Sequence, residues 1–327
     1  MKRFLIKTSL TILGLLIVSF FLDGFISKSL QHSTAQLYSP WNDLYADTLN
    51  HDMVFVGSSR TFMQYNPTVF DSVLGVNSFN LGISARGLDA QIAKYHAYCR
   101  RHGMPKYLIL NIDICIFHPS DQTEQEREHI EAHTDREQFF PYFLDRKLIN
   151  ELCNDCNEDF SWTDRFLPLM RYAGYNKVLL QACGCNKMVL APTIKGFSGL
   201  NYKNDWDYYN WGHFRYNKSE RYDSSLASLI AECRAMDVMP VFVMAPVYDQ
   251  YMLQLDNRDE AVSMVRNDAK HYMVPLLDFT DSYISADSAY FCDPVHLNSR
   301  GAYEFSLQLA QSLRDSLGFF SQTCKGF

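Results

Sequence analysis

Two adjacent serines follow the first short apolar run of the chain. In "VFVGSSRTF", residues 54–62, β-prone side chains lead directly into Gly57, Ser58 and Ser59. Sites in open parallel sheets gather beyond the carboxyl ends of the strands, because loops and helix N-termini converge there. A hydroxyl at this edge becomes a nucleophile when a base takes its proton and another group orients the base. Otherwise, either serine would simply cap the following helix.

A base and an orienting carboxylate occur near the other end of the chain. In "FCDPVHLNSRGAYEF", residues 291–305, Asp293 and His296 lie three apart, before a helix that Asn298 or Ser299 would cap. At this spacing one turn can aim the imidazole at a serine while the carboxylate accepts the other ring proton. We therefore expect Ser59 as the nucleophile, His296 as the base and Asp293 as its orienter.

A glycine between these two motifs supplies a candidate oxyanion donor. The segment "SFNLGISARG", residues 78–87, runs from a strand into Asn80 and Gly82. Because glycine lets the backbone approach a ligand closely, the amide of Gly82 could join that of Ser59 in stabilising an oxyanion. The alternative is an ordinary turn between strand and helix.

The apolar pattern predicts the elements that would position these residues. Short runs rich in Val, Ile and Leu alternate with stretches of helical period, as in βα units around a parallel sheet. We expect an α/β three-layer sandwich with a five-stranded parallel sheet. The expected strands are Met53–Val56, Ser78–Ile83, Tyr107–Ile112, Pro240–Ala245 and Val274–Phe279. The expected helices lie within residues 87–103 and over Ser224–Met236 and Ala302–Leu317.

The alternation breaks at about residues 118–222, which we interpret as a mostly helical and irregular insertion. Its aromatic part, residues 201–222, contains Trp206 and Trp211 among polar residues. These rings could stack on sugar faces or seal the insertion onto the sheet. His129 and His133 do not fit the zinc-protease pattern, because Glu131 is not where that pattern requires glutamate. We expect no metal and no cofactor.

The N-terminus has the composition of a membrane segment. Lys2, Arg3 and Lys7 precede the uncharged run Thr8–Leu22. No convincing cleavage site follows directly, so we favour an uncleaved anchor over residues 1–28 rather than a signal peptide. Positive charge keeps the N-terminal end in the cytoplasm, which predicts that residues 29–327 are exported. The net charge of −7 argues against a nucleic-acid partner.

The chain contains nine cysteines, and export would place those beyond the anchor in an oxidising compartment. Cys153 with Cys156 and Cys183 with Cys185 are the close pairs. They could hold zinc or form disulfides, and export favours disulfides.

The order of the motifs resembles the SGNH/GDSL hydrolase superfamily. G-x-S follows the first strand, N-x-G the second, and D-x-x-H precedes the last helix, over about residues 50–117 and 224–316. The resemblance implies a flavodoxin-like sheet and the roles given above to Ser59, His296, Asp293 and Gly82. The anchor and "GSSR" are more similar to the exported acyl-transfer branch, which includes DltD and the alginate acetylation proteins.

One position departs from that superfamily. Its esterases carry an oxyanion-binding Asn after the third strand, where this chain has Asp113. An ionised Asp cannot donate a hydrogen bond and would repel an oxyanion. Asn111, on the same strand face, is the candidate substitute. Candidate substrate-binding residues are Arg60, Asp113, Trp206 and Trp211.

These features predict an exported, membrane-anchored serine hydrolase or O-acyltransferase. We expect it to act on acyl esters, acetyl in particular, of cell-envelope glycans through an acyl-serine. If transfer dominates, the resemblance implies a multispanning membrane acyltransferase as partner. The alternative is a noncatalytic glycan-binding or scaffold protein that retains the fold. Asp113 and the aromatic insertion favour this alternative.

Overall fold

A computed structural model describes residues 1–84, 86–115, 136–155, 160–185, 188, 192–201 and 213–317. The chain divides into two compact units. Unit 1 comprises Met1–Asn42 with Asp135–Pro192, and unit 2 comprises Asp43–Thr134 with Thr193–Phe327.

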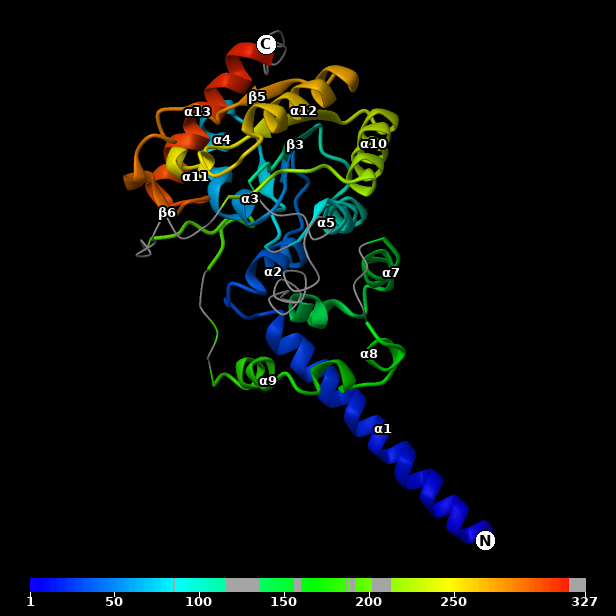
Figure 1. Ribbon diagram of the computed structural model, residues 1–327. Coiled ribbons are helices and arrows are strands. Elements are labelled where there is room, and N and C mark those ends of the chain that lie inside the picture. The colour runs from blue at the N-terminus through cyan, green and yellow to red at the C-terminus, as the bar shows by residue number, and fades with distance from the viewer. Residues whose placement is uncertain are drawn as a thin grey trace, which may run out of the picture. The chain divides into compact units, whose positions relative to one another are not determined.

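Unit 2 is built on a five-stranded parallel sheet in the order β2-β1-β3-β4-β5 (Figure 1). The strands are β1 (Met53–Val56), β2 (Ser78–Asn80), β3 (Tyr107–Asn111), β4 (Met239–Met244) and β5 (Leu276–Asp278). This is the flavodoxin-like order, so the expected fold class is confirmed. The ends of each strand lie within three residues of the expected ones. A buried apolar run predicts a strand well but does not define the residue at which the strand ends.

Helices cover both faces of the sheet. Val54, Leu108 and Phe242 point into one core, which α5, α10 and α12 cover. Phe55 and Ile109 point into the other, which α4 and α13 cover. Neighbouring residues of one strand therefore face opposite layers, as the period of two requires. Burial on both faces explains why these strands read as continuous apolar runs.

The helices of unit 2 have clear local signals. Gly103, at φ 84°, ends α5, and Asn66 caps α4 ahead of Pro67. The bounds are α3 (Ser59–Gln64), α4 (Pro67–Leu74), α5 (Leu88–His102), α10 (Glu220–Ala235), α11 (Asp249–Met252), α12 (Arg258–His271), η5 (Ser288–Tyr290) and α13 (Ser299–Leu317). A two-stranded antiparallel hairpin, β6 (Phe291–Asp293) and β7 (His296–Leu297), precedes α13. The motif of Asp293 and His296, which we expected to lie on a loop just before the last helix, therefore lies in a hairpin.

Unit 1 is helical in the residues that the structure describes. It contains α1 (Lys2–Leu30), η2 (Arg136–Tyr142), α7 (Arg146–Asp155), α8 (Trp162–Phe166), η3 (Met170–Tyr172) and α9 (Asn176–Ala182), and α2 (Ser39–Ala46) begins in it. The C-terminal part of α1 packs against η2 and α9. The N-terminal part is exposed and is apolar and long enough to cross a membrane.

Candidate active site

The predicted site residues of β1 and β3 lie at the point where the strand order of the sheet reverses. β1 and β3 are neighbours, but the chain continues from β1 to β2 on one side and from β3 to β4 on the other. Such a switch point opens a crevice beyond the carboxyl ends of the strands. Ser58, Ser59 and Arg60 follow β1 at this edge, and Asp113 follows β3.

The two adjacent serines have different partners. Ser58 caps α3 by accepting a hydrogen bond from the amide of Arg60, and its hydroxyl donates to Asp113 Oδ2 at 2.6 Å. Ser59 Oγ is half-buried and lies 2.8 Å from His296 Nε2. The cap is therefore Ser58, which leaves the Ser59 hydroxyl to the imidazole.

The hairpin β6–β7 holds the imidazole in place. Asp293 and His296 are opposite each other in its register, and His296 Nδ1 lies 2.9 Å from Asp293 Oδ2. Asp293 Oδ1 also accepts the backbone amides of Val295 and His296 at 3.0 and 2.9 Å. One carboxylate thus fixes both the turn and the ring, which explains the spacing of three residues.

These same contacts keep Asp293 ionised. Burial alone would raise the pKa of its carboxyl, but the hydrogen bond and charge of His296 and the two backbone amides lower the pKa below its usual value. An ionised Asp293 can accept the Nδ1 proton of a neutral imidazole. That tautomer leaves Nε2 as the acceptor facing Ser59.

Two glycines allow the loops to meet. A Cβ on Gly57 would collide with the Thr61 hydroxyl, and a Cβ on Gly82 would collide with the backbone of Phe62. The Gly82 amide, our candidate oxyanion donor, donates to Asn80 Oδ1 at 2.8 Å in this structure. The side-chain amide of Asn80 in turn donates to the backbone carbonyl of Thr61 in α3 and to that of Tyr65 directly after α3. Asn80 therefore fixes the Gly82 loop against α3, and the oxyanion role of Gly82 stays a prediction.

Arg60 is the most enclosed charged group at this edge, with 1% of its surface exposed. Its guanidinium binds Asp113 Oδ1 at 2.5 Å. The remaining donors reach the Cys115 thiol and three backbone carbonyls, those of Ala245, Pro246 and Val295. Burial alone would lower the pKa of Arg60, but Cys115 and Asp113 raise it. Because protein acceptors surround this buried group, a direct substrate contact by Arg60 does not fit the structure.

Asp113 does not present a free charge to the crevice. Arg60 compensates one of its oxygens, and Ser58 donates to the other. Asn111 donates to Asp113 Oδ1 at 2.6 Å and accepts from the Tyr65 hydroxyl at 2.7 Å, and it is 4% exposed. The positive charge of Arg60 therefore offsets the repulsion that Asp113 would exert on an oxyanion. The Asn111 side chain already uses its amide nitrogen to bind Asp113 and its amide oxygen to bind Tyr65. The oxyanion role of Asn111 stays a prediction.

Lys94 was not among the predicted residues, and it lies under the Gly82 loop. It is fully buried in α5 and donates to the Gly82 carbonyl at 2.9 Å. Burial lowers the pKa of Lys94 to about 7, against the charge of Asp43, which raises it. No pattern in the sequence distinguishes it from a solvated lysine, because its neighbours on the helix include both buried and exposed positions.

Several sequence predictions lie elsewhere. Trp206, Trp211, Cys156, His129 and His133 are outside the described residues. Cys183 and Cys185, which we expected to form disulfides of undetermined pairing, are exposed free thiols, and the Cys185 thiol is directed at the Cys183 carbonyl. Within the described ranges, no group of three or more His, Cys, Asp or Glu side chains could hold a metal ion.

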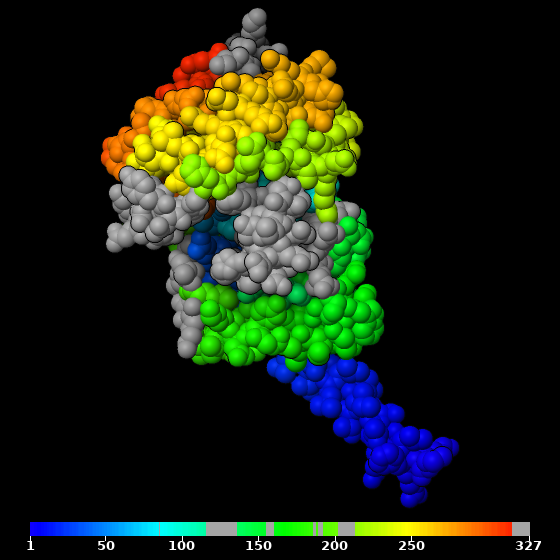
Figure 2. Space-filling view, in the orientation of Figure 1, coloured from blue at the N-terminus to red at the C-terminus, as the bar shows by residue number. Residues whose placement is uncertain are grey.

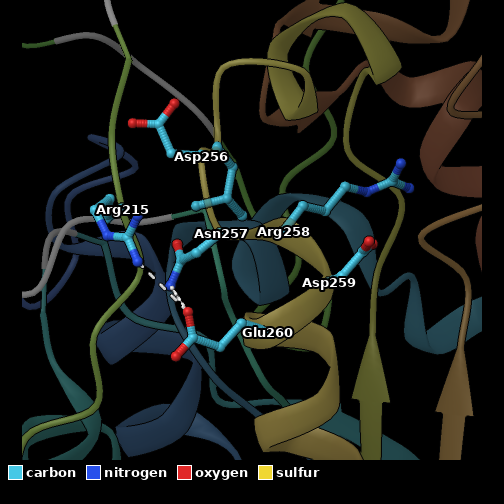
Figure 3. A pocket seen from close by; sticks show the side chains of 7 residues that line it. Arg215, Asp256, Asn257, Arg258, Asp259 and Glu260 are labelled. Atoms are coloured by element: carbon cyan, nitrogen blue, oxygen red, sulfur yellow. Dashed lines mark hydrogen bonds and ion pairs between the residues drawn. The ribbon is translucent and has the colours of Figure 1, made fainter.

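A shallow cavity of about 400 Å³ lies at the start of α12 (Figure 3). Arg215 and Asn257 both point toward Glu260 there, at 3.5 and 3.3 Å. None of the predicted site residues within the described ranges lines this cavity. It is therefore a separate feature from the Ser59 crevice.

A protein-family model matches part of the chain. Residues 204–311, about a third of the sequence, match the model of the DltD protein family. No curated protein sequence matches significantly.

Several solved structures are similar at low identity. A putative acylhydrolase from Bacteroides fragilis has 12% identity and a TM-score of 0.39, with 83% of this chain and 88% of that chain covered. A putative lipolytic protein of the G-D-S-L family from Desulfitobacterium hafniense has 10% identity and a TM-score of 0.40, with 81% and 99% covered. A catalytic mutant of an acetylxylan esterase from Geobacillus stearothermophilus has 12% identity and a TM-score of 0.39, with 81% and 94% covered.

The flavodoxin-like order of the sheet, with the motif residues at its switch point, agrees with the fold that the resemblance implied. The similarity to the DltD family is confined to residues 204–311, which include Asp293 and His296 but not Ser59.

The buried ion pair generates a first prediction. Asp113→Asn should leave the Arg60 cation buried and uncompensated, which costs on the order of 3–5 kcal/mol of unfolding free energy. Arg60→Met combined with Asp113→Asn should lose much less than the sum of the single variants. Urea unfolding of the full chain in detergent, arranged as a double-mutant cycle, measures this coupling.

The matched control is Arg258 with Asp281, which are also 2.5 Å apart but have 33% and 79% of their side chains exposed. Its coupling should stay below about 1 kcal/mol, and equal coupling in the two cycles would contradict the assigned role of burial.

Lys94 generates a pH prediction. The unfolded chain keeps the lysine proton up to about pH 10.4, whereas the folded chain releases it near pH 7. Unfolded molecules then bind more protons between these values, so this group makes stability rise with pH by about 1.4 kcal/mol per unit across the window. Relative to Lys94→Met, the wild-type unfolding free energy should show that slope. Lys106→Met, at a lysine side chain that is 74% exposed, is the control and should show none between pH 7 and 10. Parallel curves for wild type and Lys94→Met would refute the lowered pKa.

Proposed function

We propose that this protein is a membrane-anchored serine hydrolase or O-acyltransferase that acts on acyl esters of cell-envelope glycans. The observation that carries the proposal is the hydrogen-bonded chain from Ser59 Oγ through His296 to Asp293. Its members come from opposite ends of the sequence, with 237 positions between Ser59 and His296. A nucleophile, a base and an orienting group in this order form the geometric requirement for nucleophilic catalysis.

In the acylation step, His296 Nε2 takes the proton of the Ser59 hydroxyl as Oγ attacks the carbonyl carbon of the ester. Asp293 stabilises the imidazolium that forms and holds its orientation. The carbonyl oxygen becomes an oxyanion, for which the amides of Ser59 and Gly82 are the proposed donors. The imidazolium then gives its proton to the departing alcohol oxygen as the carbon–oxygen bond breaks. An acyl-Ser59 ester and a free alcohol result.

In the second step, an acceptor hydroxyl replaces the departed alcohol. His296 removes the acceptor's proton as its oxygen attacks the acyl-serine, and returns that proton to Ser59 Oγ. Water as acceptor gives hydrolysis, and a sugar hydroxyl gives transfer. The related DltD family and the exported acyl-transfer resemblance support the transfer branch. A glycan acceptor would contact Trp206 and Trp211.

The N-terminal helix supports a place at the membrane. We assign α1 as an uncleaved anchor that leaves the remainder of the chain on the exported side, because three of its four cations, Lys2, Arg3 and Lys7, lie at the N-terminal end. An acyl-transfer function at that surface requires an activated acyl group delivered across the membrane. A multispanning membrane acyltransferase is the partner that fits this requirement.

The assignment of Ser59 is tested with an active-site fluorophosphonate probe on the full chain in detergent. We expect one adduct, which peptide mapping locates to Ser59, and no adduct in Ser59→Ala. The neighbouring hydroxyl provides the matched control. Ser58→Ala should still be labelled, at a lower rate, because it removes the cap of α3 but not the nucleophile. Labelling that survives in Ser59→Ala would rule out the proposed nucleophile.

The choice of acceptor is tested with an activated acetyl ester and an envelope oligosaccharide. We expect an acetyl-enzyme and acetylated sugar, measured by mass spectrometry, both lost in Ser59→Ala and His296→Ala. Acetate release alone would make the protein a hydrolase. Glycan binding that persists unchanged in both variants, without any ester turnover, would instead support the noncatalytic scaffold.

A further inference from the structure

Asp23 binds α1 to the rest of unit 1, although Phe25, two residues further on, is still 64% exposed. Its carboxylate binds the Arg171 guanidinium at 2.6 Å and accepts the Leu169 amide at 2.9 Å. Further along α1, Ser27 contacts Tyr172 and Arg171. The helix from Lys2 to Leu22, in contrast, stands clear of the rest of unit 1 (Figure 2). At 1.5 Å per residue that stretch is about 30 Å long, which is the thickness of a bilayer's hydrocarbon core.

The contacts of Asp23 therefore fix the depth of η3 and α8 relative to a bilayer that α1 spans. Leu169 lies at the level where α1 leaves the hydrocarbon core. Phe166 is three residues from Leu169, so its backbone is at most about 10 Å away. Figure 1 shows α1 continuing past α8 and α9 as it leaves the unit. This part of unit 1 is thus held at the height of the lipid headgroups.

Large apolar side chains are exposed on α8 and at the start of η3. Trp162 is 64%, Phe166 52% and Met170 43% exposed. The Trp162 and Phe166 rings contact each other at 5.6 Å, and the guanidinium groups of Arg146 and Arg165 lie over Phe166. Scattered exposed apolar residues are ordinary. A tryptophan, a phenylalanine and cations together beside a membrane-spanning helix have the composition of a membrane interface.

We propose that Trp162, Phe166 and Met170 form a membrane seat, which inserts into the headgroup region of the same bilayer that α1 spans. The inference rests on the anchor assigned under the proposed function. Lipid is the occupant because Asp23 binds Leu169 and Arg171, which flank Met170, and so ties the seat to the apolar helix α1. Arg146 and Arg165 are placed to meet lipid phosphates. Unit 1 then contacts the membrane at two places, the helix and the seat, which restricts its tilt and rotation.

Quenching of tryptophan fluorescence by brominated phosphatidylcholine tests the seat. The full chain is placed in lipid nanodiscs with bromines near the headgroup or deep in the acyl chains. We expect Trp162 emission to be quenched by the shallow bromines more than by the deep ones. The difference between wild type and Trp162→Phe isolates this signal from the other three tryptophans, of which Trp41 is buried.

A tryptophan in the helix separates failure of the seat from failure of the anchor. Leu16→Trp, made in the Trp162→Phe background, should be quenched most by the deep bromines, since Leu16 lies within the exposed part of α1. Quenching at that position with none at Trp162 would overturn the seat and leave the anchor standing. It would also favour a protein partner as the cover of this surface. No quenching at either position would contradict the anchor, and the seat with it.

Discussion

The arrangement of the crevice depends on one buried ion pair, between Arg60 and Asp113. Arg60 follows β1 and Asp113 follows β3, so the pair joins the two strands at the switch point. The same guanidinium reaches the carbonyls after β4 and the Val295 carbonyl in the hairpin that carries His296. A buried charge is expensive unless it is paired and fully hydrogen-bonded. That requirement makes one side chain hold the loops of three strands and the hairpin in a single geometry.

This pair also changes how the departure from the superfamily pattern is understood. From the sequence, Asp113 was a carboxylate at a position where the superfamily esterases place an oxyanion donor. In the structure its charge is compensated by Arg60, and Ser58 and Asn111 donate to it. "GSSR" and Asp113 are therefore coupled features, because an arginine directly after the nucleophile position has a carboxylate across the sheet edge. Where the superfamily esterases have an Asn that donates to the substrate, this chain has the Arg60–Asp113 ion pair, which supports the backbone.

The fold was accessible from the sequence because its signals are local. Runs such as Met53–Val56 are apolar on both faces, and Gly103 or Asn66 mark helix ends through their own conformations. The meeting of Ser59 with His296 was predictable only through motif order. The role of Arg60 was not, since its partners are backbone carbonyls that no residue type reveals. Lys94 was missed for a similar reason, because burial is set by the packing of α5 on the sheet and not by the lysine itself. The hairpin β6–β7 was taken for a loop because each of its strands is only two or three residues long.

The hairpin has a consequence for when the candidate site can form. Asp293 and His296 form their contacts within a turn, so that half of the site can assemble locally. Ser59 lies near the start of unit 2, in α3, on which α13 packs. Because a polypeptide is synthesised from its N-terminus, the Ser59 hydroxyl exists long before the His296 imidazole is made. The hydrogen bond between them therefore forms only when nearly the whole chain has been synthesised.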